Sequence, residues 1–499
     1  MPRSRFSLAL PFRSLVTKGQ FFSDADILCR GCTSDPRQVR EGDLFVATSI
    51  EGDAHEHASQ AVERGAVAVV SEQLLPLDVP QAIVSDARSA FGHACHKLAG
   101  DPSKQIPIIG VTGSLGKTTT ALLTASVLNS ERQGVAAFTT LAHCDSVRAI
   151  PATSTTPQAD ELSGLLKSAV DRHCSHAVAE LSSTGLAENR AAGVELAVAV
   201  LTNIRRQHLD RHNTFTAYRT AKERIFGLLR AGGSAVVNID DSFCNSLLGR
   251  LKHPALTVSL HGQADVTATL LERYASEQTF MLEAGNDSIA VRTRMVGDHH
   301  IYNCLSAAAV GLLSGLDLPV IARGLEAVEM IPGRMERIEC GQGFTTYIDD
   351  ARTHDALAVA LRTARHVTRG RVICVMSPSA VADAAERPLL GRVLEKMADV
   401  RVITSEAAAD KDSLARSHDV LDGFERSGRA SVIPSRDKAI AWSLEHARPG
   451  DVVMVCGQGH REWQASASTT DDSTFVREKL YEIVAREVRS KPIVFAYQG

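Results

Sequence analysis

The stretch from Gly110 to Thr120, GVTGSLGKTTT, carries the residue types that hold a nucleotide phosphate chain. A Walker A loop needs a glycine, four residues and then Gly-Lys-Ser/Thr. Val111 stands where the first glycine is required, so the strict pattern fails by one residue. Lys117 can still reach the β- and γ-phosphate oxygens, and Thr118 can ligate Mg²⁺ beside backbone N–H groups. The residues predicted to contact a nucleotide here are Gly113, Ser114, Gly116, Lys117, Thr118 and Thr119.

The segments around this loop predict how it is positioned. PIIGV before the loop reads as a strand, and KTTTALLTASVLN after it reads as a helix. Buried-strand runs then alternate with helical segments, which predicts a mainly parallel sheet covered by helices. Similar α/β blocks precede and follow, with a break at MIPGRMERI, where Pro332 and Gly333 stand. We therefore expect three domains, at residues 1–105, 106–333 and 334–499.

The bulk composition limits the classes of function. The 499 residues are 44% hydrophobic with a formal net charge of −4, which gives no basic field for nucleic acid. The apolar runs are too short to span a membrane, and the N-terminus lacks a secretory cleavage pattern. Ten mostly scattered cysteines suit a reducing compartment, so we expect a cytoplasmic protein. Cys29 and Cys32 have CxxC spacing, but no second such pair completes a four-thiolate zinc site.

A series of motifs resembles the Mur ligase family in order along nearly the whole chain. TTPQADEL, AELSSTGLAENR, LTNIRRQHLDRHNTFTAYRTAKERIF, VVNIDD, GLEAVEMIPGRMERI and GDVVMVCGQGH follow the phosphate loop. GDLFVA and GAVAVV near the N-terminus resemble the UDP-binding domain of the family's UDP-N-acetylmuramoyl-tripeptide synthetase branch. The resemblance implies an α/β fold of three domains, with a central P-loop parallel-sheet ATPase domain and a Rossmann-like C-terminal domain.

The resemblance also implies ATP-driven amide bond formation. A substrate carboxylate takes the γ-phosphoryl group of ATP, and the amine of an amino acid then attacks the acyl phosphate. Lys117, His208 and Lys222 match catalytic positions, with Lys222 expected to react with CO₂ as a neutral amine and form a carbamate. The Mg²⁺ ligands would be Thr118, Glu180, His208 and Lys222. The other nucleotide contacts would come from Asn238, Arg334 and Asp349.

The same resemblance assigns an acceptor site. Thr155, Thr156, Ser182 and Arg190 match positions that hold UDP-N-acetylmuramoyl-L-alanyl-D-glutamate in this branch. The guanidinium of Arg190 suits an anionic group. The partners are thus small molecules, and we expect a monomer.

Departures from the family pattern concentrate in the C-terminal domain, with others in the central motifs and in the uridine-binding segment. Positions of family residues are occupied here by Pro36, Thr184, Gln207, Arg352, His354, Ala382, Ala409 and Arg461. Two arginines that hold diaminopimelate are replaced by Ala382 and Ala409, and Arg461 replaces a glutamate that pairs with its distal ammonium. A zwitterionic diaminopimelate would find too few partners.

Two interpretations stay open. The protein is either an active ligase for a different amino acid or a divergent paralogue that binds nucleotide and muramoyl peptide in a regulatory role. A P-loop kinase or transport ATPase would require a strict Walker A loop and a Walker B aspartate.

Overall fold

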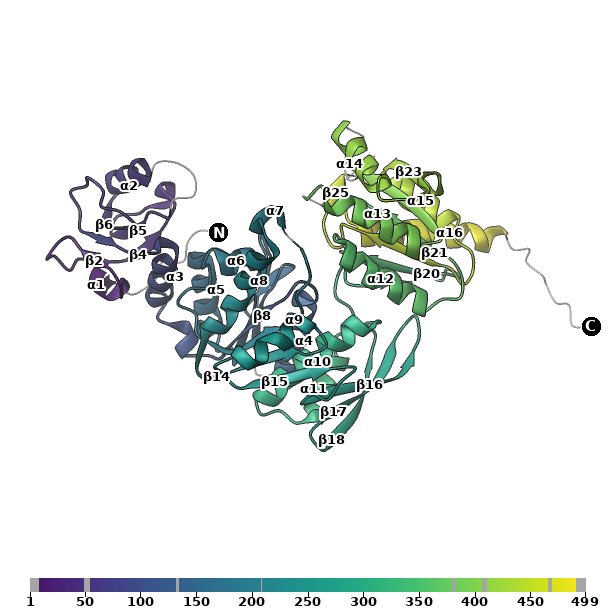
Figure 1. The fold of residues 1–499 in the computed structure, drawn as a ribbon, viewed down its shortest axis with the longest axis horizontal. Helices are drawn as coiled ribbons and strands as arrows, with labels where there is room; N and C mark the ends of the chain where they lie inside the picture. The colour runs from purple at the N-terminus through teal and green to yellow at the C-terminus, as the bar shows by residue number, and fades with distance from the viewer. Residues whose placement is uncertain are drawn as a thin grey trace, which may run out of the picture.

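The computed structural model describes residues 9–48, 54–131, 134–207, 209–378, 383–405, 411–464 and 469–490. They form three α/β bodies that follow one another along the chain, with the first and third at opposite ends of the middle one (Figure 1). Each body is built around its own sheet, of five, eleven and six strands respectively. Among these residues no helix is both long and apolar enough to cross a membrane.

The first body has the strand order β2-β7-β6-β5-β4. Its strands are β2 (Gln20–Phe21), β4 (Gly31–Thr33), β5 (Asp43–Val46), β6 (Ala66–Ser71) and β7 (Gln81–Ile83). All neighbours are parallel except β2 and β7. Helices α2 (Ala54–Glu63) and α3 (Ala87–Leu98) cover the sheet, and the side chain of Asp86 caps α3 by accepting from Ser89 N.

The middle body is a long sheet with a parallel centre. Seven strands run parallel, in the order β9 (Val135–Phe138), β12 (His176–Glu180), β8 (Ile108–Thr112), β13 (Leu196–Leu201), β14 (Leu229–Asn238), β15 (Ala255–Ser259) and β16 (Val266–Arg273). Antiparallel strands extend both edges: β10 (Ala142–Cys144) and β11 (Ala149–Pro151) at one, β17 (Gln278–Ala284) and β18 (Asp287–Thr293) at the other.

Both faces of this sheet are buried, as the continuous apolar strands predict. Ile109 of β8 packs in one core with α4 (Lys117–Leu128), α10 (Asp298–Leu313) and α11 (Leu318–Glu326). Ile108, one residue earlier, belongs to the core on the opposite face, with α5 (Ala159–Asp171). The sheet is thereby fixed between two helical layers, and the carboxyl ends of β8, β12, β13 and β14 present their loops at one edge.

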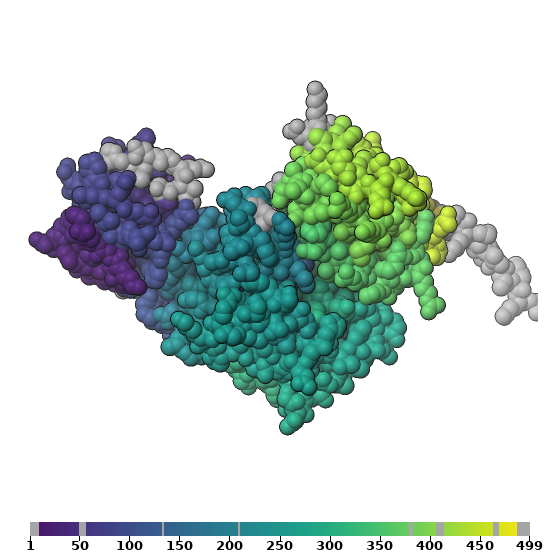
Figure 2. All heavy atoms as spheres, in the orientation of Figure 1, coloured from purple at the N-terminus to yellow at the C-terminus, as the bar shows by residue number. Residues whose placement is uncertain are grey.

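The third body has the strand order β19-β20-β24-β21-β22-β23. Its strands are β19 (Glu336–Ile338), β20 (Thr345–Asp349), β21 (Val372–Met376), β22 (Val400–Ser405), β23 (Ala430–Ser435) and β24 (Val452–Cys456). Only β19 pairs antiparallel. The helices are α12 (His354–His366), α13 (Glu386–Met397), α14 (Lys411–Leu421), α15 (Arg436–Glu445) and α16 (Asp472–Ser490). This body rests against the middle one in the space-filling view (Figure 2).

The α/β fold, with a parallel central sheet in the middle body and a mainly parallel sheet in the third, agrees with the predicted fold class. The domain boundaries after residues 105 and 333 stay a prediction.

Candidate functional site

The phosphate loop joins β8 to α4 in a conformation that requires its glycines. Gly116 has φ +84°, in the left-handed region, and a Cβ there would lie 2.3 Å from Asn303 Oδ1. A Cβ on Gly113 would lie 1.9 Å from Thr202 Oγ1. Because residues of α10 and of the segment after β13 approach the loop this closely, a side chain at Gly113 or Gly116 would displace the loop.

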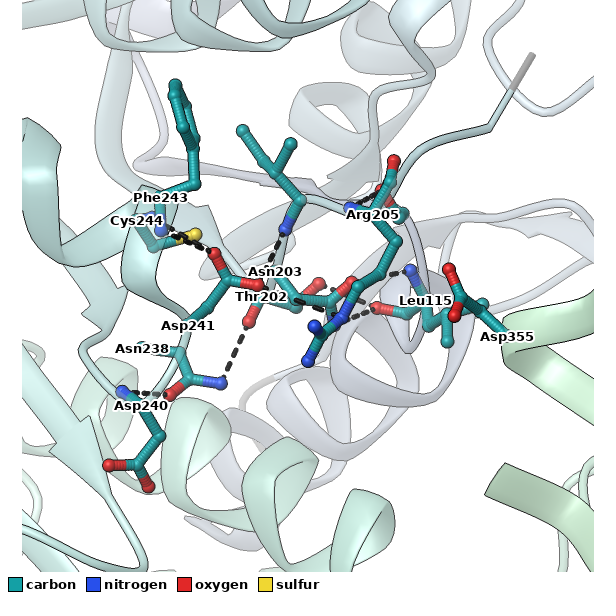
Figure 3. Close-up of polar contacts among 12 residues, drawn as sticks. Leu115, Thr202, Asn203, Arg205, Asn238, Asp240, Asp241, Phe243, Cys244 and Asp355 are labelled. Carbon is teal, nitrogen blue, oxygen red and sulfur yellow. Dashed lines mark hydrogen bonds and ion pairs between the residues drawn. The ribbon is translucent and has the colours of Figure 1, made fainter. Parts of the chain in front are cut away.

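The end of β13 holds the loop by hydrogen bonds. Leu115 N donates to Asn203 Oδ1 (2.9 Å), while Thr202 Oγ1 and Asn203 Nδ2 donate to Leu115 O (2.6 and 3.0 Å), as Figure 3 shows. Asn238 Nδ2, from the end of β14, donates to Thr202 O over 3.1 Å. The loop is therefore preorganised by side chains from two neighbouring strands, and only Asn238 among these was predicted to belong to the site.

Glu180 ends β12 directly beside the loop. Its Oε2 accepts from Thr118 Oγ1, Thr140 N and Thr140 Oγ1, each over 3.0 Å. Its side chain is buried, and a buried carboxylate is retained only when its lone pairs have partners. A carboxylate beside a hydroxyl at the start of a phosphate-loop helix is a donor set of hard oxygens that suits Mg²⁺. In the part of the chain described, no three His, Cys, Asp or Glu side chains gather as a metal site.

Two lysines lie under and beside the loop. Lys117 Nζ donates to Ser114 O (3.1 Å), and Lys222 Nζ, from α8 (Phe215–Glu223), donates to Gly113 O (2.6 Å). Burial lowers the pKa of Lys117, an effect that Glu180 opposes. Burial, reinforced by the charge of Lys117, holds the pKa of Lys222 well below its ordinary value. A fully buried lysine with a depressed pKa has a neutral, nucleophilic amine available.

The third body contributes an acidic and basic cluster at the end of β20. Asp350 pairs with both Arg334 (Nη1–Oδ2, 2.8 Å) and Arg352 (Nη2–Oδ1, 2.6 Å). Asp349 Oδ2 accepts from Met335 N over 2.8 Å. Burial raises the pKa of Asp349 to about 6, although Arg334 opposes the shift. Charges of Asp350 and Arg334 also act on Lys117, which places this cluster close to the phosphate loop.

One cavity of about 510 Å³ brings the two bodies together. Ten of the predicted residues line it: Ser114, Gly116, Lys117, Thr118, Thr119, Thr155, Glu180, Asn238, Arg334 and Asp349. Gly113 and Lys222 are absent from its lining and are joined to each other by a hydrogen bond. His208 lies outside the described residues, as do Ala382 and Ala409.

Residues from α10 and the β14–α9 loop complete the cavity and were not predicted. Tyr302 donates to Asp240 Oδ2 (2.7 Å), and Asn303 Oδ1 accepts from Thr120 Oγ1 (3.1 Å).

Asp241, in the β14–α9 loop, accepts from the backbone N–H groups of Phe243 and Cys244 and so caps α9 (Ser242–Leu247). Its Oδ2 lies 3.8 Å from Arg205 Nε (Figure 3). The two aspartates that follow Asn238 after one intervening residue were the available signal, because polar residues at strand ends in a parallel sheet face a common edge.

The predicted acceptor residues form a cluster that is hydrogen-bonded to the backbone of Glu180. Thr156 Oγ1 donates to Glu180 O (3.1 Å) and accepts from Ser182 N (2.8 Å). Thr155 Oγ1 accepts from Thr140 Oγ1 over 3.1 Å. Arg190 Nη1 donates to Thr156 O over 2.7 Å. The four residues are thus brought together, but of these only Thr155 lines the cavity.

A glycine-rich loop at the carboxyl edge of a parallel sheet, facing an arginine and aspartates from a second α/β body, defines a nucleotide-binding protein of two cooperating domains. The family model of the Mur ligase middle domain matches residues 111–311. The model of the Mur ligase glutamate ligase domain matches residues 333–459. The chain belongs to the Mur ligase family, which confirms the assignment made from its motifs.

Named relatives cover almost the whole chain. The UDP-N-acetylmuramoyl-L-alanyl-D-glutamate–2,6-diaminopimelate ligase of Geobacillus kaustophilus is 35% identical over 86% of this chain and 90% of its own length. The enzyme of the same name from Solibacter usitatus is 34% identical over 90% and 93%.

Solved structures agree with the family assignment. A structure of a ligase of that same name is 27% identical, with a TM-score of 0.70, and the match covers 96% of this chain and 100% of that one. MurF ligase from Thermotoga maritima in complex with ADP has the same fold at 19% identity, with a TM-score of 0.60 and coverage of 92% and 98%.

Proposed function

We propose that this protein is a cytoplasmic ATP-dependent ligase that joins an amino acid to UDP-N-acetylmuramoyl-L-alanyl-D-glutamate in the synthesis of peptidoglycan precursors. The observation that carries the proposal is that Lys117 and Glu180 of the middle body line the same cavity as Arg334 and Asp349 of the third. The names of relatives that match over most of the chain support the same substrate. The chain would act as a monomer of three domains, at residues 1–105, 106–333 and 334–499.

The reaction divides into two transfers. An acceptor carboxylate oxygen attacks the γ-phosphorus of ATP, and ADP leaves. The amine nitrogen of the amino acid then attacks the acyl carbon, inorganic phosphate leaves, and the amine loses a proton. Both steps depend on positioning and on neutralising charge, because protein groups form no covalent bond to the substrate.

Each side chain in the cavity has a role in that scheme. The backbone N–H groups of the loop and the ammonium of Lys117 would hold the β- and γ-phosphates. Arg334 would neutralise charge on the transferred group from the opposite side of the cavity. Asn238 and Asp349 would hold the nucleoside part of ATP. Because Asp350 pairs with Arg334, the guanidinium is already oriented before nucleotide enters.

Magnesium would be held by Thr118 and Glu180, together with His208 and a carbamate on Lys222. The ion would supply charge neutralisation for the phosphate oxygens when bound. The oxygen donors present fit that ion, since Thr118 Oγ1 and Glu180 Oε2 already lie 3.0 Å apart. The neutral amine of Lys222 would attack CO₂, forming an N–C bond and losing a proton, so that a cationic side chain becomes an anionic oxygen ligand.

The test is an assay of ADP release with UDP-N-acetylmuramoyl-L-alanyl-D-glutamate and, in turn, each of the twenty amino acids and diaminopimelate. Release that depends on both the acceptor and one amine supports the ligase. Tight binding of nucleotide and acceptor with no amine-dependent release would instead support a regulatory paralogue, which the replaced diaminopimelate residues favour.

A further inference from the structure

The guanidinium of Arg190 is already engaged by its own chain. Nε donates to Glu188 Oε2 (2.7 Å), and Nη2 lies 2.6 Å from the same oxygen. Nη1 donates to Thr156 O over 2.7 Å. A guanidinium has five N–H groups, so these contacts leave only part of its donor capacity for a ligand. Arg190 is therefore a donor of fixed orientation whose charge is offset by a carboxylate at contact distance.

The backbone between Glu188 and Arg190 is held from the first body. Glu188 follows the short helix α6 (Ser183–Ala187), and Asn189 has φ +55°, in the left-handed region. Asn189 Nδ2 donates to Asp86 Oδ2 over 2.7 Å, and Asp86 also caps α3. The ion pair thus lies where the first and middle bodies meet, and its geometry is constrained by both.

The ion pair is also connected to Glu180. The carbonyl that accepts from Arg190 belongs to Thr156, whose hydroxyl donates to Glu180 O over 3.1 Å. The side chains of Arg190 and Glu188 are 18% and 27% exposed, so a ligand can reach the pair while water screens it incompletely. Arg190 is therefore linked through Thr156 to the backbone of Glu180, whose side chain is a predicted Mg²⁺ ligand.

We propose that Glu188 is a positioning and specificity-determining residue, which orients Arg190 and offsets its charge so that the acceptor group bound there is recognised through hydrogen bonds with little selection for negative charge. A carboxylate that approaches Arg190 is attracted by the guanidinium and repelled by Glu188 at a similar distance, so the two Coulomb energies largely cancel. A carboxamide oxygen accepts the same N–H donors without that repulsion.

This inference rests on the proposed function. The dipeptide of the proposed acceptor has two carboxyl groups. One is activated in the reaction, and the other stays free. The structure favours an enzyme that binds the free carboxylate and the corresponding carboxamide with similar affinity.

The test measures acceptor binding by calorimetry without an amino acid, so that no turnover occurs. The two acceptors are the UDP-linked dipeptide with a free second carboxylate and the same compound with a carboxamide there. The wild type should bind them within about threefold of each other. Glu188→Gln keeps the shape and an acceptor oxygen for Arg190 Nε but removes the negative charge. It should favour the acid by at least about tenfold, because charge-assisted hydrogen bonds are roughly twice as strong as neutral ones.

Control variants separate this effect from a general change in the protein. Glu195→Gln removes an exposed glutamate of the same body and should leave the ratio at the wild-type value. Arg190→Ala, introduced into the Glu188→Gln variant, should abolish the preference of that variant for the acid. The binding of the acid by Glu188→Gln should weaken more steeply with salt than that of the wild type.

Two results would overturn the inference, and only one of them would also overturn the proposed function. A Glu188→Gln variant that binds the acceptors but keeps the wild-type ratio refutes the role of Glu188 and leaves the proposed function standing. A wild type that binds neither acceptor refutes the proposed function and the inference together.

Discussion

Gln207 and Thr353 are joined by a hydrogen bond between two bodies of the chain: Gln207 Nε2 donates to Thr353 Oγ1 over 2.9 Å. Gln207 follows β13 in the middle body, whereas Thr353 caps the start of α12 in the third. Both side chains line the cavity between the two bodies, and Gln207 is buried. The contact therefore belongs to the arrangement in which the third body lies over the phosphate loop.

We expect Gln207→Leu to weaken this arrangement without unfolding either body. A net hydrogen bond contributes about 1 kcal/mol, so kcat/KM for ATP should fall roughly fivefold while the midpoint of thermal unfolding changes little. Thr353→Ser keeps the hydroxyl and the helix cap and serves as the control with near wild-type rates. An unchanged kcat/KM in Gln207→Leu would show that the contact does not contribute to closure.

Lys117→Ala should remove nucleotide binding or turnover. The ammonium is the cation of the phosphate loop, and a lost charged contact costs about 1.5–3 kcal/mol, or roughly 10- to 150-fold in affinity. Fluorescence titration with an ATP analogue measures the effect. Lys167→Ala, which removes a lysine paired with Asp171 on α5, is the matched control and should bind as the wild type does. Equal affinities in the two variants would refute the loop assignment.

The sequence predicted the parts of this site that depend on local pattern. The loop from Gly113 to Thr119 was recognisable because its glycines, lysine and threonine occur at fixed spacing between a strand and a helix. The meeting of Lys117 with Arg334 across more than two hundred residues followed from the family resemblance, since no local pattern encodes which two bodies face one another.

The contacts that were missed depend on tertiary packing. Thr202 and Asn203 hold Leu115 only because β13 lies next to β8 in the sheet. Asn303, which lies within α10, packs against Gly116 at the start of α4. Glu188 was adjacent to a predicted residue, but its pairing with Arg190 depends on the left-handed backbone at Asn189, which composition does not specify.

His354 should make stability depend on pH near neutrality. His354 Nδ1 lies 2.6 Å from Glu386 Oε2, and this hydrogen bond, with Asp355 nearby, raises the pKa of the imidazole above its ordinary value of 6.5. The protonated form is favoured in the folded state, so its contribution to stability is fully present below the ordinary pKa. That contribution is lost as pH rises through the raised folded pKa.

The comparison of the wild type with His354→Gln between about pH 5.5 and 8.5 measures this contribution. The difference in unfolding midpoint should be largest at the acid end and shrink as pH rises. Glu386→Gln should flatten the dependence as well. A difference that stays constant across the range would mean that His354 is not titrating against Glu386.

The protein should not prefer meso-diaminopimelate. Arg461 lines the cavity as a cation where the family pattern has a glutamate, and Ala382 and Ala409 replace arginines. Each lost charged contact costs ~2–3 kcal/mol, or roughly 30- to 150-fold. Competition between diaminopimelate and the other amino acids in the ADP-release assay measures the preference, with the Geobacillus kaustophilus relative as the positive control. Efficient addition of diaminopimelate by this protein would contradict our interpretation of its third body.

Lys222 gives the sharpest test of catalysis. Lys222→Ala should abolish amine-dependent ADP release, because the variant can form neither the carbamate nor the contact with Gly113 O. Added bicarbonate should not restore the activity, since no amine remains to react with CO₂. A short carboxylic acid such as acetate should restore part of it, because its oxygens can occupy the space of the carbamate beside Glu180.

The control for that experiment is Lys222→Arg, which places a permanent cation at this position but forms no stable carbamate, and thermal unfolding of each variant checks its fold. Lys222→Arg should be as inactive as Lys222→Ala and should not respond to acetate, because its side chain fills the space. Activity that survives in Lys222→Arg would assign Lys222 a purely electrostatic role under the phosphate loop. Acetate rescue of Lys222→Ala alone would establish that the catalytic requirement at this position is for carboxylate oxygens.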